Sequence, residues 1–133
     1  MSLGIYPEFK PELKSDKFDC LGESLAFSFQ KLDQITAEVK LTPFSAFADN
    51  RPVPEDFDGD PEALLESMGE WNEWFDPAFG RDAIGKLVEH IKATPKAKRR
   101  LKYADAVVAE LEELVRVLDE AVNQGVKFRL RMS

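Results

Sequence analysis

The sequence predicts a mainly α-helical single domain, spanning residues 1–133, with a long C-terminal helix and a small β element after it. Residues 102–124 repeat apolar side chains at spacings of three and four, as on a helix that buries one broad face. These side chains are Ala104, Val107, Leu111, Leu114, Leu118 and Ala121. Residues 126–132 then alternate apolar and basic side chains, the period of a half-buried strand. Gly125 separates the two patterns and can adopt the left-handed conformation that ends a helix.

The composition is typical of a folded domain. The 133 residues are 44% hydrophobic and include ten phenylalanines, enough for one core. No apolar run approaches the roughly 18 residues of a membrane span, and the N-terminus lacks the pattern of a signal peptide. Cys20 is the only cysteine, so an internal disulfide is excluded. Together these features favour a cytoplasmic protein of bacterial type.

The N-terminal part predicts shorter elements. Ile5, Tyr6 and Phe9 favour an extended segment, and two prolines in this region exclude a long helix. Asp19 can cap a helix, and helical spacing of apolar residues then predicts that this helix covers residues 21–40.

Four cap-and-proline pairs divide the middle of the chain: Thr42-Pro43, Asp60-Pro61, Asp76-Pro77 and Thr94-Pro95. Proline suits the first helical position because the N–H that it lacks would have no partner there. The pairs predict helices over 43–48, 61–68 and 77–93. Phe44 and Phe47 should face inward from the first of these. Gly85 lies inside the last one, where it indicates either a close backbone crossing or a tolerated defect.

Residues 49–76 hold ten acids and one base, Arg51. Asp56, Asp58 and Asp60 invite a calcium-loop interpretation, but the sixth position of such a loop needs glycine and holds Pro61. We therefore predict no metal and no cofactor. Most of these acids are expected to lie in a solvated loop or to complement helix N-termini.

Both tryptophans, Trp71 and Trp74, lie at the end of this acidic stretch. Tryptophan is enriched at the hot spots of protein interfaces, and acids around it would select a basic partner. The predicted partner-binding residues are Trp71, Trp74, Asp56, Asp58, Glu70 and Glu73. The competing interpretation is that both rings close the core beside Phe75.

Residues 92–102 contain six bases and no acid. They suggest a nucleic-acid-binding patch as an alternative function, although only Tyr103 is an adjacent aromatic residue and the net charge of −7 opposes it. A small enzyme that uses the acidic 49–76 region is the other alternative. His90 and Cys20 lack motif context, so no catalytic residue is predicted.

The sequence thus favours a small acidic, non-catalytic module that binds a basic protein and no membrane. An inhibitor of the immunity or antitoxin type is one version, by charge analogy alone. The C-terminal strand needs a partner for its backbone groups. We expect the segment around residues 5–9 to provide it within a monomer, the alternative being strand pairing in a homodimer.

Overall fold

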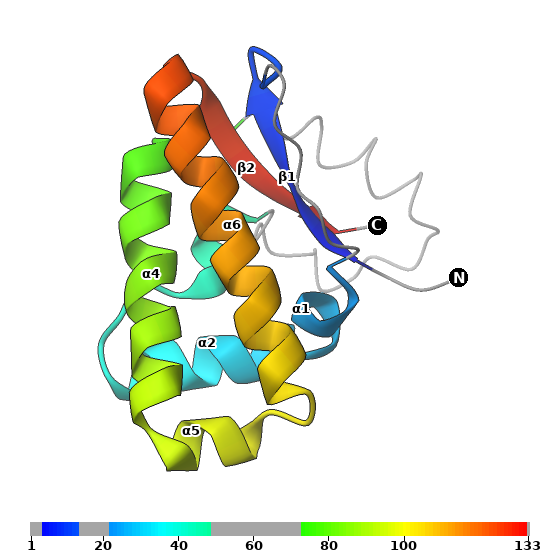
Figure 1. Cartoon of the computed structure of the whole chain (residues 1–133), viewed down its shortest axis with the longest axis vertical. Coiled ribbons are helices and arrows are strands. Elements are labelled where there is room, and N and C mark those ends of the chain that lie inside the picture. Colours follow the sequence, from blue (N-terminus) through cyan, green and yellow to red (C-terminus); the bar gives the residue numbers. More distant parts are fainter. Residues whose placement is uncertain (1–3, 14–21, 49–72, 133) are drawn as a thin grey trace, which may run out of the picture.

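The computed structural model describes residues 4–13, 22–48 and 73–132 (Figure 1). Its elements in chain order are β1 (Ile5–Lys10), α1 (Glu23–Phe27), α2 (Phe29–Glu38), the 3-10 helix η1 (Phe44–Phe47), α4 (Pro77–Ala93), α5 (Pro95–Arg100), α6 (Ala104–Gln124) and β2 (Lys127–Met132). The described part of the chain is mostly helical with a small antiparallel sheet, which confirms the predicted fold class.

Helix α6 is the central element, as predicted. Figure 1 shows α4 lying along it, with the sheet behind and α5 closing one end. Most of the apolar stripe is buried, including Leu111, Leu114 and Leu118 at 0% exposure. Gly125 ends the helix in the left-handed conformation, with φ of 69°. Its N–H and that of Val126 donate to the last carbonyls of α6, which satisfies groups that a helix end leaves unpaired.

Helix α4 begins as predicted. The Asp76 carboxylate caps it by accepting a hydrogen bond of 2.9 Å from the Ala78 N–H, and Pro77 occupies the first helical position. The two glycines of α4 differ in their surroundings. A Cβ at Gly80 would overlap the Phe128 ring, whereas a Cβ at Gly85 would meet open space. The close crossing suggested for Gly85 is therefore wrong, and Gly80 is the glycine that the packing requires.

Strand β2 pairs with β1 in an antiparallel register that sets Pro7 opposite Leu130. This confirms the predicted internal partner of the C-terminal strand. The Ile5 N–H points away from β2 and donates to the Gly22 carbonyl at 3.0 Å. Because alternate N–H groups of a strand point the same way, Pro7 also faces this outer edge, where its missing N–H costs no bond with β2. On the other edge of β2, Phe128 and Phe75 exchange hydrogen bonds of 2.8 and 3.0 Å.

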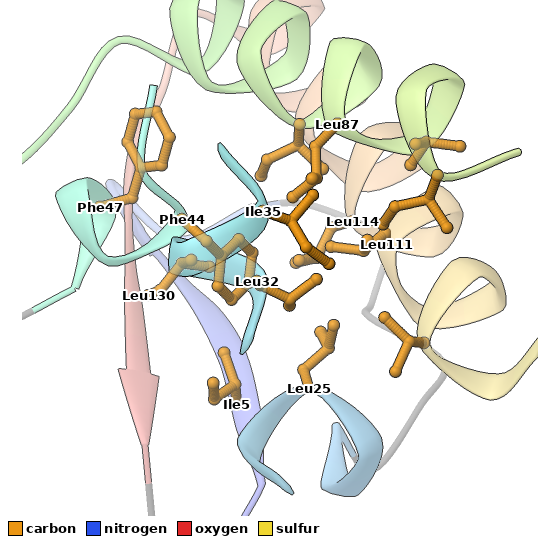
Figure 2. Packing of buried hydrophobic residues seen from close by; sticks show 14 of the residues in the cluster. Ile5, Leu25, Leu32, Ile35, Phe44, Phe47, Leu87, Leu111, Leu114 and Leu130 are labelled. Atoms are coloured by element: carbon orange, nitrogen blue, oxygen red, sulfur yellow. The ribbon is translucent and has the colours of Figure 1, made fainter. Parts of the chain in front are cut away.

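The core lies between the sheet, α1, α2 and the α4–α6 pair. Figure 2 shows Ile5 and Leu130 approaching it from the sheet, Leu25 from α1, and Ile35 from α2. Phe44 and Phe47 are each 1% exposed, which confirms that η1 turns them inward. The centroid of the Phe47 ring lies within 5.8 Å of the ring centroids of Phe75, Phe79 and Phe128.

Two sequence predictions about local structure are wrong. The helix over 21–40 is broken at Ser28, where φ of −98° and ψ of 9° separate α1 from α2. The break turns Leu25 and the α2 side chains into the core from different directions (Figure 2). Thr42 does not cap η1, because Asp33 of α2 supplies the acceptor for the Ser45 N–H at 3.0 Å. Asp19, Asp60 and the 61–68 helix lie outside the described residues.

Candidate functional site

Two of the predicted partner-binding residues, Glu73 and Trp74, lie within the described part of the chain, and Asp56, Asp58, Glu70 and Trp71 lie outside it. Glu73 is exposed. Trp74 is half-buried and does not belong to the core cluster, whereas the adjacent Phe75 packs against that cluster. Among the described residues, Trp74 thus lies outside the core cluster, and the core-closing interpretation stays a prediction for Trp71, which lies outside these residues.

Trp74 lies against the polar face of the sheet. This face carries Tyr6, Glu8 and Lys10 from β1 and Lys127, Arg129 and Arg131 from β2. These residues alternate along the strands with Ile5, Phe9, Phe128 and Leu130, which pack in or against the core, so they point the other way. We call this face together with Trp74 the sheet surface.

Arg129 is the centre of the sheet surface. Its guanidinium lies 4.2 Å from the Trp74 ring centroid, and its Nε donates to Glu8 Oε1 at 2.8 Å. Glu8 also accepts from Arg131 at 3.2 Å, and the Lys10 ammonium lies 5.7 Å from the Trp74 centroid. A cation over an indole face contributes about 0.5–1 kcal/mol when exposed and about 2 when desolvated. The Arg129 side chain is 13% exposed, so its contact with the Trp74 ring is largely desolvated.

The charge of the sheet surface is opposite to that of the whole chain. It carries four bases, Lys10, Lys127, Arg129 and Arg131, against one acid, Glu8, in a chain of net charge −7. Sequence reasoning expected acids around Trp74 because it considered only neighbours along the chain. The alternation of basic residues in 126–132 was visible, but only the strand register shows which aromatic residue they meet.

The basic segment 92–102 runs from the last turn of α4 through α5 to the turn before α6, at the end of the molecule away from Gly125 (Figure 1). Two of its bases pair with acids. Lys92 contacts Glu112 at 3.2 Å, and Arg100 contacts Glu38 at 2.6 Å. Both pairs lie on the surface, where such contacts contribute little. They show that part of this segment balances acidic neighbours.

His90 is the only histidine of the chain and Cys20 the only cysteine. His90 is half-buried and its Nδ1 lies 3.4 Å from Thr94 Oγ1, while Cys20 lies outside the described ranges. Within these ranges, no three histidine, cysteine or acidic side chains form a cluster that could hold a metal ion. A cleft of about 220 Å³ between the α2–η1 turn and α4 is lined by Lys40, Phe79, Asp82 and Lys86, among others.

Arg81, outside the sheet surface, links α4 to α6 through a side-chain contact. It donates to Asp119 at 2.9 Å, and this hydrogen bond, together with the nearby Asp82, raises the pKa of the Arg81 guanidinium.

Among the helices that the structure describes, none combines the length and the apolar character that crossing a bilayer requires.

Comparisons with known proteins find no matching protein family, no matching curated protein and no matching solved structure.

Proposed function

We propose that this protein is a non-catalytic module that binds another protein through the surface around Trp74. The position of Trp74 carries the proposal: an indole ring that is half-buried, outside the core, and fixed against Arg129 at 4.2 Å. Interface hot spots are rich in tryptophan, tyrosine and arginine, and the sheet surface combines Trp74, Tyr6, Arg129 and Arg131. A ring that is already ordered loses little entropy on binding.

The charge of the partner depends on which neighbours of Trp74 it meets. The acids of residues 49–76, including Asp56, Asp58, Glu70 and Glu73, favour a basic partner, as an inhibitor of the immunity type would need. The bases Lys10, Lys127 and Arg131 favour an acidic partner instead, because they can pair with its carboxylates. Both versions predict binding that weakens as salt rises, since exposed charges are screened beyond about 8–10 Å.

Bait variants of the intact chain test the proposal. We expect Trp74→Ala to lose a specific protein that the parent captures from a lysate of the native host, as quantified by mass spectrometry. Phe79→Ala, which truncates an aromatic ring that is 55% exposed on α4 and outside the sheet surface, is the matched control and should retain it. Calorimetry with the identified partner should then show a loss of about tenfold or more in affinity for Trp74→Ala, the scale of a hot-spot residue.

Two charge reversals distinguish the kind of partner. Glu73→Lys should weaken the binding of a basic partner and strengthen that of an acidic one, and Lys10→Glu should have the opposite effects. Retention of every captured protein and of full affinity by Trp74→Ala, with the fold intact by circular dichroism, would show that the surface around Trp74 is not the binding site.

A further inference from the structure

Two exposed aromatic rings lie close together at the α5 end of the molecule. Phe27, at the end of α1, is 63% exposed and Tyr103, just before α6, is 48% exposed. Their ring centroids lie 5.4 Å apart in a T-shaped arrangement. The Lys102 ammonium lies 5.8 Å from the Phe27 centroid and 5.6 Å from that of Tyr103. Large aromatic side chains left in water at this exposure are typical anchors of interfaces.

Helix α5, which leads into the turn that carries Tyr103, supplies further basic side chains. Helix α5 is held by Ala97 and Leu101, which are buried, and it exposes Lys96, Lys98 and Arg99. Within the described residues these three bases and Lys102 form no ion pair, in contrast to Lys92 and Arg100. Figure 1 places α5 and the turn to α6 together at one end of the fold. We define the α5 surface as Phe27, Lys96, Lys98, Arg99, Lys102 and Tyr103.

We propose that the α5 surface docks a short acidic peptide segment of a protein partner, with an apolar or aromatic side chain among its acids. The carboxylates of such a segment complement the four bases, and its apolar side chain covers Phe27. This second surface lies on other elements and at another end of the fold than the surface around Trp74, so each proposal is tested independently of the other.

The surroundings favour a peptide over a single-stranded nucleic acid. Base stacking needs open ring faces and a basic path for successive phosphates. Here the Phe27 and Tyr103 rings are T-shaped to each other, with 64° between their planes, so they do not present parallel faces to successive bases. Exposed acids border the surface, namely Glu38 and Glu112 beside the paired bases and Asp105 in the first turn of α6. A peptide confines its charge to the exposed bases, whereas a longer polyanion would extend over these acids in a chain of net charge −7.

Fluorescence anisotropy with the full chain tests this inference. The probe is a short fluorescein-labelled peptide of glutamate and phenylalanine, and a peptide with glutamine in place of each glutamate is its neutral counterpart. A labelled thymidine oligonucleotide provides the comparison with nucleic acid. We expect the acidic peptide to bind at low salt more tightly than the other two probes. Phe27→Ala and the double change Lys98→Glu with Arg99→Glu should each weaken it about tenfold or more.

The control for charge is the double change Lys31→Glu with Lys86→Glu, which reverses two exposed bases on α2 and α4 outside both surfaces and should leave peptide binding unchanged. The control for an aromatic truncation is Phe79→Ala, because Phe79 is 55% exposed on α4. Thermal unfolding of each variant confirms that the fold persists. Equal weakening by the Lys31→Glu with Lys86→Glu control, tighter binding of the oligonucleotide, or no binding of the acidic peptide at low salt would each overturn the proposal.

Discussion

The sheet surface and the α5 surface both set a cation against an aromatic ring, yet the fold restrains the two cations very differently. Arg129 belongs to a paired strand, its side chain is 13% exposed, and Glu8 accepts from it at 2.8 Å. Lys102 belongs to an exposed turn, and its ammonium lies more than 5.5 Å from both ring centroids. The comparison indicates that Arg129 contributes to the stability of the domain, whereas Lys102 remains available to a ligand.

The packing below the two surfaces extends this difference. Beneath the sheet surface, Phe128 is fully buried and forms backbone hydrogen bonds with Phe75. Its ring packs so closely against Gly80 that no space remains for a Cβ at that glycine. At the other end, Phe27 and Tyr103 extend into solvent, and α5 is anchored mainly by Ala97 and Leu101. We therefore expect truncation of the buried residues beneath the sheet surface to lower the free energy of unfolding, and truncation of the exposed side chains at the α5 end to leave it nearly unchanged.

Removal of residues 126–133 should have the largest effect. It deletes β2, and with it Phe128 and Leu130, which are both 0% exposed. Each large core side chain contributes about 2–5 kcal/mol, and their sum approaches the 5–15 kcal/mol that stabilises a typical domain. The truncated chain should be largely unfolded by circular dichroism, at any protein concentration. If the intact protein is a dimer by light scattering and the truncated chain a folded monomer, the expectation of a monomer is wrong.

Leu111→Ala should have the next largest effect, because α6 supports both ends of the molecule. Leu111 is 0% exposed in the middle of the helix, so the free energy of unfolding should fall by about 2–5 kcal/mol. Urea unfolding measures this loss, and Glu112→Ala on the exposed face of the same helix is the control. A urea midpoint for Leu111→Ala equal to that of the parent would contradict the burial of this stripe.

The two glycines of α4 give a smaller and sharper comparison. Gly80→Ala should destabilise by about 1–3 kcal/mol, because the new methyl group must displace the Phe128 ring. Gly85→Ala should stabilise by about 0.5–1 kcal/mol, because it meets open space and favours the helix. Thermal unfolding should show a lower melting temperature than the parent for Gly80→Ala and a higher one for Gly85→Ala. Equal shifts in the same direction would show that Phe128 does not pack against Gly80 as described.

The sequence predicts local features of this fold better than long-range ones. The α6 stripe, the Gly125 stop, the Asp76 cap and the β2 alternation each depend on neighbours within a few residues, and the structure confirms them. The break at Ser28 and the cap that Asp33 gives to Ser45 arise from tertiary packing, which no local pattern contains. The same holds for both surfaces: Trp74 meets Arg129, and Phe27 meets Tyr103, only because distant segments fold together.

The smallest expected effect tests the comparison between the two cations directly. Arg129→Ala removes the contact with Trp74 and the charge-assisted bond to Glu8, and should lower the free energy of unfolding by about 1–3 kcal/mol. Arg129→Lys keeps the charge but loses the planar stacking geometry, so its loss should be intermediate. Lys102→Ala should change stability by no more than about 0.5 kcal/mol, as surface substitutions usually do. Urea unfolding at low and high salt measures all three, and the Arg129 losses should persist at high salt because the side chain is mostly buried. Equal losses for Arg129→Ala and Lys102→Ala would mean that the fold does not distinguish the two cations, and that Arg129 is as free to engage a partner as Lys102.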